Sequence, residues 1–358
     1  MRGGEKVLEV VCELFPQATL FTLLHNQGAM SETIEKMDIR TSFMQNFPFR
    51  KEKYRNYLPL MPRAIESFDF SGFDLILSLS HCVAKGAIPK NNALHICYCF
   101  TPMRYVWELY DDYFGKGRAG LTTRMAMSLV APYLRRWDVR TAGRVHYFVT
   151  SAHNVAARID RHYGRTADVV HAPVDSNFFM LSKRSGDYYL MVSALVPYKR
   201  VDLAVDAFNW NGQRLLIAGK GPELERLKKK AKPNIEFLGW QSDESLRNLY
   251  ANCRALIFPG EEDFGITPLE AMASGKPVIA FAKGGVLETV VEKGNKVTGV
   301  FFREQTAPAL LEAVQKFEKK RFNPSAIRER AEKFSRESFK RSLRVYINEK
   351  VRQHFKPA

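Results

Sequence analysis

The sequence lacks several features that would place it in a familiar class. No run of about 20 uncharged apolar residues occurs, so no transmembrane span is expected, and no signal-peptide pattern is recognised near its start. It contains no zinc-finger spacing and no RNA-binding signature of aromatic residues and glycine, which makes nucleic acid a poor fit as a partner. Its five cysteines are an odd number without metal-like pairing. This usage fits a reducing cytosol and predicts no metal site.

The composition is that of a globular protein with a strong positive charge. The 358 residues are 46% hydrophobic and 26% charged, with a net charge of +16. This length allows two domains with separate cores, and the charge suits anionic substrates or an anionic membrane surface. Between Lys116 and Arg144, seven basic residues face one acid, Asp138. The apolar segment 121–137 within this stretch is predicted to be helical, either in a bilayer interface or as a core helix with a basic rim.

Strand-like and helical segments alternate along both halves. The first half predicts strands at 19–24, 40–44, 75–79, 94–99, 146–150 and 169–172, and helices at 6–14, 124–140 and 152–163. The second half predicts strands at 189–193, 214–218, 235–238, 255–258, 278–281 and 299–302, with helices between them. Such alternation indicates two doubly wound α/β domains with parallel sheets. We expect the join within 176–187 and a cleft at the carboxyl ends of both sheets.

The start of the chain departs from this pattern. Residues 1–6 have the composition of a glycine-rich turn that opens the first helix, and no strand-like segment precedes them. A doubly wound domain normally begins with a strand, and the loss of an innermost strand leaves a sheet edge unpaired. The sequence therefore predicts a first domain without its first strand.

The most informative stretch is 258–280. Leu256–Phe258 is predicted as a strand, and a loop with Glu262 follows it. Thr267, Pro268 and Glu270 match a capping box with proline at the first helical position, and Gly275 ends the helix. A helix N-terminus at the carboxyl end of a buried strand binds phosphate in α/β proteins. The two carboxylates are separated by seven residues and suit the hydroxyls of a sugar and a ribose, although capping alone would also explain Glu270.

Two other loops of the second half follow predicted strands. Lys199 and Arg200 precede an amphipathic helix, where two cations oppose the helix dipole. They suit a diphosphate, and the alternative is a solvated pair. Gly219 and Lys220 belong to a G-x-G turn that lets the backbone approach a ligand, but this signal is weak because a P-loop ending is lacking.

The first half offers candidates on the acceptor side. Arg104, Tyr105 and Trp107 follow the predicted strand 94–99 and suit sugar stacking and hydroxyl contacts. An aromatic core plug explains the same residues equally well. His81 lies at the end of another predicted strand, where a structural role is the simpler interpretation.

Taken in order, these motifs resemble the retaining glycosyltransferases of family 4. The most specific runs are 262–277 and Val196–Asp202, while 2–8, 101–105 and 173–175 are similar to mannosyltransferase-like enzymes of bacterial O-antigen and polysaccharide assembly. The resemblance covers nearly the whole chain. It implies the GT-B fold, in which two Rossmann-like domains face each other across a cleft, and three segments: an acceptor-side domain at 1–178, a nucleotide-sugar domain at 179–335, and a terminal helix at 336–358 that crosses back to the first domain.

The resemblance also implies roles for individual residues. Glu270 would bind the ribose, Glu262 the donor sugar, and Lys199 the diphosphate, with Glu262 and Lys199 as catalytic residues and no metal or other cofactor. The further donor-binding positions would be Gly3, Gly4, Arg200, Gly219, Lys220, Gly265, Ile266 and Thr267. It implies a nucleotide-sugar such as GDP-mannose, a glycan or lipid-linked glycan acceptor, and a cytoplasmic location, at the inner face of the plasma membrane if the enzyme is peripheral.

The sequence departs from the family pattern at three places. Many relatives have arginine where this chain has Ala194 and histidine where it has Phe100, and the first strand is missing. These departures keep a second hypothesis open, a catalytically inert GT-B scaffold that binds glycan, membrane or a partner enzyme. A GT-B phosphorylase or an epimerase is a further alternative, although no pyridoxal phosphate lysine signal is found.

Overall fold

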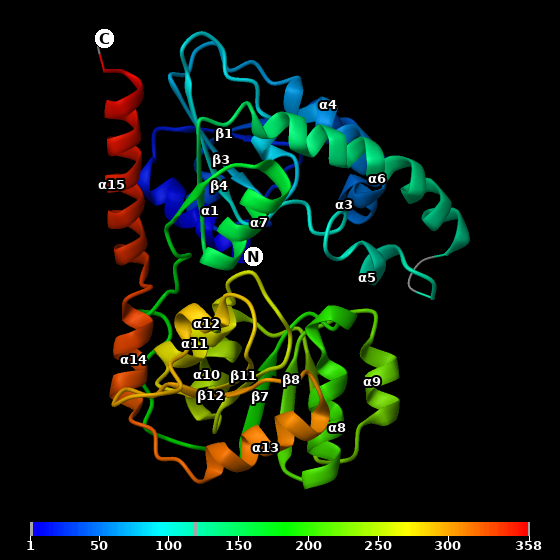
Figure 1. The fold of residues 1–358 in the computed structure, drawn as a ribbon, viewed down its shortest axis with the longest axis vertical. Helices are drawn as coiled ribbons and strands as arrows, with labels where there is room; N and C mark the ends of the chain where they lie inside the picture. Colours follow the sequence, from blue (N-terminus) through cyan, green and yellow to red (C-terminus); the bar gives the residue numbers. More distant parts are fainter. Residues whose placement is uncertain (1–2, 118–119, 357–358) are drawn as a thin grey trace. The chain divides into compact units, whose positions relative to one another are not determined.

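The computed structural model describes residues 3–117 and 120–356, which form two compact units. The first unit comprises residues up to His171 together with 339–358, and the second comprises Ala172–Ser338. Arg2, part of one of the motifs named above, lies outside the described residues. The last helix, α15 (Arg336–His354), runs from the end of the second unit into the first, while the division before it falls at 171/172 rather than at the expected 178/179 (Figure 1).

The first unit contains two parallel sheets, one of two strands and one of four. The smaller sheet pairs β1 (Thr19–Thr22) with β2 (Asp38–Thr41), and the larger has the order β3-β4-β5-β6. Its strands are β3 (Leu75–Ser80), β4 (Leu94–Cys99), β5 (Tyr147–Thr150) and β6 (Ala167–Val169). All six residues of β4 are buried, whereas the residues of β1 are all half-buried. β4 is therefore an interior strand, and β1 has only one strand partner.

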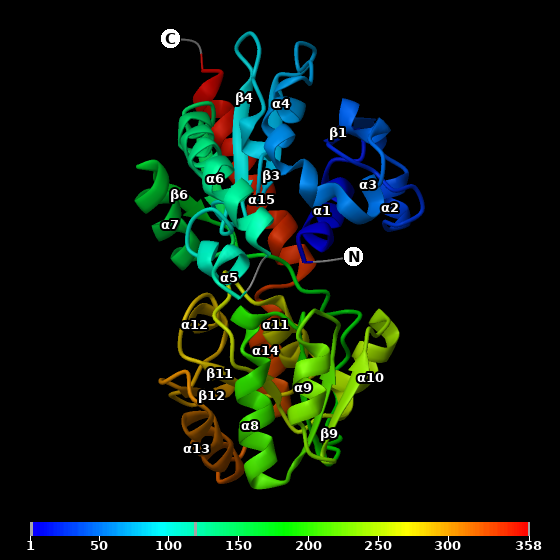
Figure 2. The same cartoon turned by 90° about the vertical axis from the view of Figure 1, so that its right-hand side faces the viewer.

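The helices of this unit lie around the two sheets, except that α5 and the first half of α6 project away from them (Figures 1 and 2). They are α1 (Gly3–Leu14), α2 (Glu32–Glu35), α3 (Arg50–Lys53), α4 (Met61–Glu66), α5 (Tyr110–Phe114), α6 (Leu121–Ala142), α7 (His153–Tyr163) and α15, with short 3-10 segments at Phe43–Asn46, Tyr54–Leu60 (η2) and Ala84–Gly86. Within the described residues no strand precedes α1. Gly3 and Gly4 were expected in a loop, but they form the first turn of α1.

Two strand predictions of the first half were shifted. The segment 40–44 was predicted as a strand, but β2 ends at Thr41 and Ser42 caps the 3-10 helix that follows. The segment 169–172 was also expected to be extended, while β6 ends at Val169. Both segments are short, and periodicity alone does not locate the end of such strands.

The second unit is a six-stranded parallel sheet with helices on its faces. The strand order is β12-β11-β10-β7-β8-β9, with β7 (Tyr188–Val192), β8 (Arg214–Ala218), β9 (Ile235–Gly239), β10 (Leu256–Phe258), β11 (Val278–Phe281) and β12 (Gly299–Phe302). The helices are α8 (Val201–Asn211), α9 (Leu224–Lys230), α10 (Asp243–Asn252), α11 (Ile266–Ala273), α12 (Val286–Thr289), α13 (Ala307–Glu318) and α14 (Pro324–Glu332).

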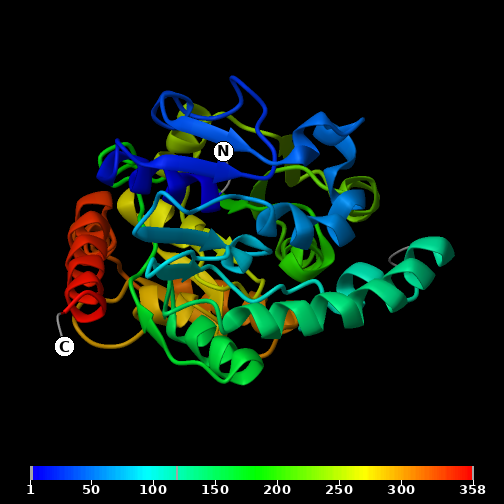
Figure 3. The ribbon, with the colours of Figure 1, turned by 90° about the horizontal axis from the view of Figure 1, so that it is seen from above.

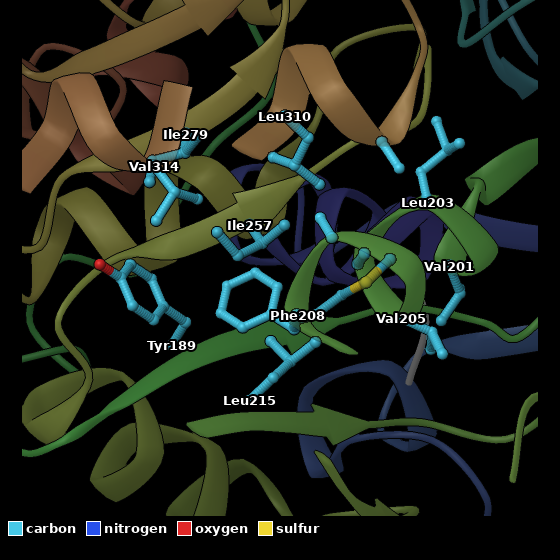
Figure 4. Close-up of a cluster of buried hydrophobic side chains, with 14 of the residues drawn as sticks. Tyr189, Val201, Leu203, Val205, Phe208, Leu215, Ile257, Ile279, Leu310 and Val314 are labelled. Atoms are coloured by element: carbon cyan, nitrogen blue, oxygen red, sulfur yellow. The ribbon is translucent and has the colours of Figure 1, made fainter. Parts of the chain in front are cut away.

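The core of the second unit joins α8 and α13 to one face of this sheet. Phe208 of α8 and Leu310 of α13 are fully buried against strand residues such as Leu215 and Ile257 (Figure 4). The ring of Tyr189 packs edge-on against Phe208, with 5.1 Å between the centroids. Each such side chain contributes about 1.5–3 kcal/mol on burial, so the loops at the strand ends are held on a rigid support.

The described residues contain no helix with the length and apolar character needed to cross a bilayer. They also contain no group of three or more His, Cys, Asp or Glu side chains arranged to hold a metal ion.

A buried histidine makes the stability of the first unit depend on pH. His95 on β4 is fully buried, its Nε2 lies 2.9 Å from Ser78 Oγ, and its Nδ1 lies 3.1 Å from the Arg144 carbonyl oxygen. Burial lowers the pKa of His95 from 6.5 to about 3. Between pH 6.5 and pH 3, His95 is therefore protonated in the unfolded chain but neutral in the folded chain. Its contribution to the free energy of unfolding is complete above pH 6.5 and is lost as the pH falls toward 3.

We expect the free energy of unfolding to fall by about 1.4 kcal/mol per pH unit once the pH is well below 6.5. Urea unfolding at pH 7 and pH 5 measures this change. His95→Gln should remove the part of the loss that His95 causes, and His153→Gln, at an exposed position on α7, should leave it. An equal pH dependence in wild type and His95→Gln would contradict the assignment.

Candidate functional site

The loops that carry the candidate residues meet at the centre of the second sheet. β7 pairs with β8 on one side and with β10 on the other, so the strand order reverses between β7 and β10. Ligands of open α/β sheets bind at such a switch point, outside the carboxyl ends of the strands. The β7 loop carries Lys199 and the β10 loop carries Glu262, and both residues therefore lie at this position.

Lys199 and Glu262 form an ion pair across the switch point. Lys199 ends the 3-10 turn η4 (Pro197–Lys199), and its ammonium contacts Glu262 Oε1. The two side chains are 16% and 25% exposed, so both remain open to solvent on one side. Gly260 permits this approach, because a Cβ there would lie only 3.0 Å from Lys199 Cα. The sequence predicted both residues as part of one site, and the structure brings them together.

Two adjacent glycines, Gly284 and Gly285, pack against the main chain of the Glu262 loop. Gly285 donates its N–H to the Glu262 carbonyl oxygen at 3.0 Å, and Gly284 forms a bridge with Glu262. A Cβ on Gly284 would lie 2.4 Å from that carbonyl oxygen, and one on Gly285 would lie 2.4 Å from the Asp263 carbonyl oxygen. Sequence reasoning missed these two residues, although adjacent glycines shortly after a buried strand are a signal for close backbone approach.

Glu270 lies on α11, and its local structure differs from the prediction. The capping box is wrong, because α11 begins at Ile266, with Gly265 as the N-cap at φ 86° and no side-chain cap. Glu270 is thus in the second turn. Glu270 as a whole is 5% exposed, and its carboxylate accepts a hydrogen bond of 2.8 Å from the Tyr250 hydroxyl. Burial, and then the Glu270 charge, raise the pKa of Tyr250 well above its usual value, so Tyr250 stays protonated and keeps donating.

The first main-chain N–H groups of α11 have no partner within the helix, and they lie where the loop after β10 ends. Gly265, Ile266 and Thr267 supply these groups, while Pro268 has none. The positive end of a helix dipole at this place favours an anion. The positive φ of Gly265 disfavours other residues there, and a Cβ would also lie 3.1 Å from the Phe258 ring.

Arg200 is held by neighbours from its own unit. It adopts a left-handed conformation at φ 53° as the N-cap of α8, and its guanidinium lies 3.2 Å from Asp202 Oδ1 and 3.1 Å from Gln305 Oε1. Gln305 in turn donates to the Pro259 carbonyl oxygen at 3.0 Å. Arg200 therefore ties the loops after β7, β10 and β12 together.

The Gly219–Lys220 turn packs directly on the β7 loop. Gly219 has φ 140°, and a Cβ there would lie 1.8 Å from the Ser193 carbonyl oxygen. Leu195 N donates to the Lys220 carbonyl oxygen at 3.0 Å, which joins the two loops through their main chains. The Lys220 side chain is exposed. The absence of a side chain at Gly219 thus allows the loops after β7 and β8 to lie in close contact.

The acceptor-side candidates belong to the first unit, where several are engaged. The Tyr105 hydroxyl lies 2.6 Å from Cys82 Sγ, and Trp107 Nε1 donates to Asp138 Oδ2 at 2.9 Å. Trp107 also stacks on His162, and both aromatic residues pack against one hydrophobic cluster. These contacts fit the aromatic core plug. Arg104 is half-buried in the same segment, and His81 is exposed just after β3.

Comparisons with known proteins find a family match within the second unit. Residues 176–339 match the family model described as glycosyl transferases group 1. The matched segment spans nearly the whole second unit and includes Lys199, Glu262 and Glu270.

Individual relatives agree with this match. The chain is 31% identical over 201 residues to the human alpha-1,3/1,6-mannosyltransferase ALG2, a match that covers 49% of this chain and 46% of that protein. It is 28% identical over 152 residues to the O-antigen chain mannosyltransferase RfbU of Salmonella typhimurium, covering 38% and 42% of the two chains. The matches span less than half the length of these curated relatives.

Similarity to solved structures extends over nearly the whole chain. Sucrose-phosphate synthase from Thermosynechococcus elongatus superposes with a TM-score of 0.72 at 17% identity, covering 98% of this chain and 92% of that one. At this identity the likeness concerns the fold. The chain therefore has the GT-B fold of glycosyltransferases, built from parallel α/β units.

Proposed function

We propose that this protein is a retaining, metal-independent glycosyltransferase. It transfers a sugar, with mannose from GDP-mannose as the best candidate, to a glycan or lipid-linked glycan in cell-surface polysaccharide synthesis. The observation that carries the proposal is the Lys199–Glu262 pair at the switch point of the second sheet, beside the N-terminus of α11. The match to glycosyl transferases group 1 and the mannosyltransferases among the relatives support it.

Each group of the site has a role in the proposed reaction. The main-chain N–H groups at the start of α11 and the Lys199 ammonium bind the donor diphosphate and stabilise its growing charge. Glu262 accepts hydrogen bonds from the donor sugar, and the Glu270 carboxylate, oriented by Tyr250, accepts them from the ribose. Lys199 supplies the positive charge that a metal ion supplies in other enzymes.

In the chemical step, one bond at the sugar C1 breaks and another forms on the same face. The C1–oxygen bond to the diphosphate breaks, the acceptor oxygen bonds to C1, and the acceptor proton passes to the departing phosphate. Neither glutamate is needed as a nucleophile. A lipid-linked acceptor would place the protein at the cytoplasmic face of the plasma membrane, where a net charge of +16 favours an anionic surface.

A second candidate function rests on the surroundings of Phe100. The Phe100 ring lies 3.5 Å from the position of a Cβ on Gly4. An apolar ring therefore occupies the position where many relatives have histidine. Ala194 likewise offers no cation at the position where many relatives have arginine. An inert GT-B scaffold that binds a glycan, a membrane or a partner enzyme would tolerate both substitutions.

A thermal-shift panel of GDP, UDP, ADP and their sugar conjugates tests the donor site. At a hundredfold excess over its Kd, the correct nucleotide should raise the Tm of the second unit by about 5–10 °C. Glu270→Gln, which keeps the side-chain volume, should lose most of this shift because it removes the charged ribose acceptor. Glu261→Gln, a neighbouring carboxylate that pairs with Lys283, should retain it. If none of the nucleotides raises the Tm of the folded protein, the inert scaffold is favoured.

A further inference from the structure

Helix α6 has two apolar faces, and only one of them is covered within its unit. Met127, Ala131 and Leu134 are buried in the hydrophobic cluster of the first unit. On the opposite side Leu121, Met125 and Leu129 are 68%, 62% and 80% exposed. These three follow one another at intervals of four residues and therefore form a row along the helix. We call this row the α6 stripe.

The α6 stripe continues into a basic segment of the same face. Arg136 and Arg140 lie about two and three turns beyond Leu129 and are exposed. Within the described part of the chain, neither arginine has an ion-pair partner. One face of α6 is thus apolar over its first half and cationic over its second.

A neighbouring segment repeats this combination. Residues 49–60 pack on α6, since Tyr54 and Tyr57 join the cluster that contains Met127 and Leu134. The same segment exposes Phe49 (66%) and Leu60 (43%) together with basic side chains at Lys51, Lys53 and Arg55. Figures 1 and 3 show the first half of α6 projecting outward from the sheets of its unit.

We propose that the α6 stripe, with the adjoining segment 49–60, docks on the surface of an anionic lipid bilayer. A row of large apolar side chains gains free energy by entering the boundary between headgroups and acyl chains, and arginines beside it reach lipid phosphates. A second copy of the chain fits this face less well, because its own cations would meet those of the partner. The choice of a bilayer rests on the proposed lipid-linked acceptor, but docking requires neither donor nor acceptor.

Vesicle co-sedimentation tests the proposal with the full chain. We expect binding to vesicles of phosphatidylcholine mixed with phosphatidylglycerol, and weak binding to phosphatidylcholine alone. The variant Leu121→Ser/Met125→Ser/Leu129→Ser should bind at least about tenfold more weakly. A control variant, Met180→Ser/Trp210→Ser/Val345→Ser, removes three exposed apolar side chains elsewhere and should bind like the wild type.

The two arginines beside the α6 stripe are tested by a second variant and its own control. Arg136→Gln/Arg140→Gln should weaken binding about tenfold and reduce its dependence on salt, whereas Lys228→Gln/Lys229→Gln on α9 should change neither. As a second measurement, Met125→Trp should show a blue-shifted emission when vesicles are added.

Three results would overturn the proposal. They are no binding of the wild type at low salt, equal binding of the stripe variant and its control, and a wild-type dimer that the stripe variant dissociates. Nucleotide-induced thermal shifts of the same preparations report on the second unit alone. A failure of docking therefore remains distinguishable from a failure of the proposed transferase activity.

Discussion

Replacing Glu262 with alanine should lower kcat/KM for sugar transfer by about 10²–10³, provided that the donor found by thermal shift is used. Removal of one preorganised polar group at a site of developing charge has an effect of this size. Lys199→Ala should cause a similar loss, because the ammonium then no longer stabilises the departing diphosphate. The double variant should be little worse than the more severe single variant, since the two side chains act as a contacting pair.

The control for this experiment lies next to the site. Glu261 pairs with the exposed Lys283 at 3.0 Å, and Glu261→Ala should retain transfer activity within about threefold, as expected for an exposed ion pair. Initial rates of nucleotide release with an acceptor present, compared with rates without it, measure the effect. Full transfer activity in both Glu262→Ala and Lys199→Ala would rule out the assigned roles.

A second large effect is expected in the first unit, at Lys85. Its ammonium lies 3.0 Å from Asp138 Oδ1 and donates to Thr141 Oγ1 at 2.7 Å. Lys85 and Asp138 are 1% and 0% exposed. Lys85→Met should lower the free energy of unfolding by about 3–5 kcal/mol, because it leaves the Asp138 carboxylate buried without its counter-charge.

Urea unfolding of matched variants measures this loss. Lys90→Met removes an exposed ion pair with Asp69 and should cost less than about 1 kcal/mol. Lys85→Met/Asp138→Asn should recover part of the stability, since the amide oxygen can still accept hydrogen bonds from Trp107 and Tyr163. If Lys85→Met and Lys90→Met unfold at the same urea concentration, the buried pair does not contribute as described.

Several strands could be predicted to the residue. The structure confirms the predicted bounds of β4, β8, β11 and β12. These strands are short apolar runs between turn residues, and this local pattern decides their limits. The alternating pattern also places Lys199 and Glu262 at one edge of the sheet, because parallel strands end along the same edge. Their direct pairing depends in addition on β7 lying next to β10.

The features that were missed depend on contacts between distant residues. The sequence Thr267-Pro268-Leu269-Glu270 satisfies a capping rule, but the Glu270 side chain is engaged by Tyr250, which lies twenty residues earlier. Lys85 and Asp138 are 53 residues apart, and neither has a local signal that indicates burial. The position of Arg200 likewise depends on Gln305, which lies in the loop after the edge strand β12. Local patterns cannot specify such pairs, because tertiary packing selects them.

The second unit begins and ends at nearly the same point. Val174 donates its N–H to the Phe334 carbonyl oxygen at 2.8 Å, and it bridges Ser335. Arg328 adds hydrogen bonds of 2.9 Å to the carbonyl oxygens of Ser176 and Phe179. In topological terms, residues 172–338 are therefore a continuous insertion in the first unit, whose own chain stops at 171 and resumes at 339. A graft of this segment would need only two junctions, and the two lie next to each other.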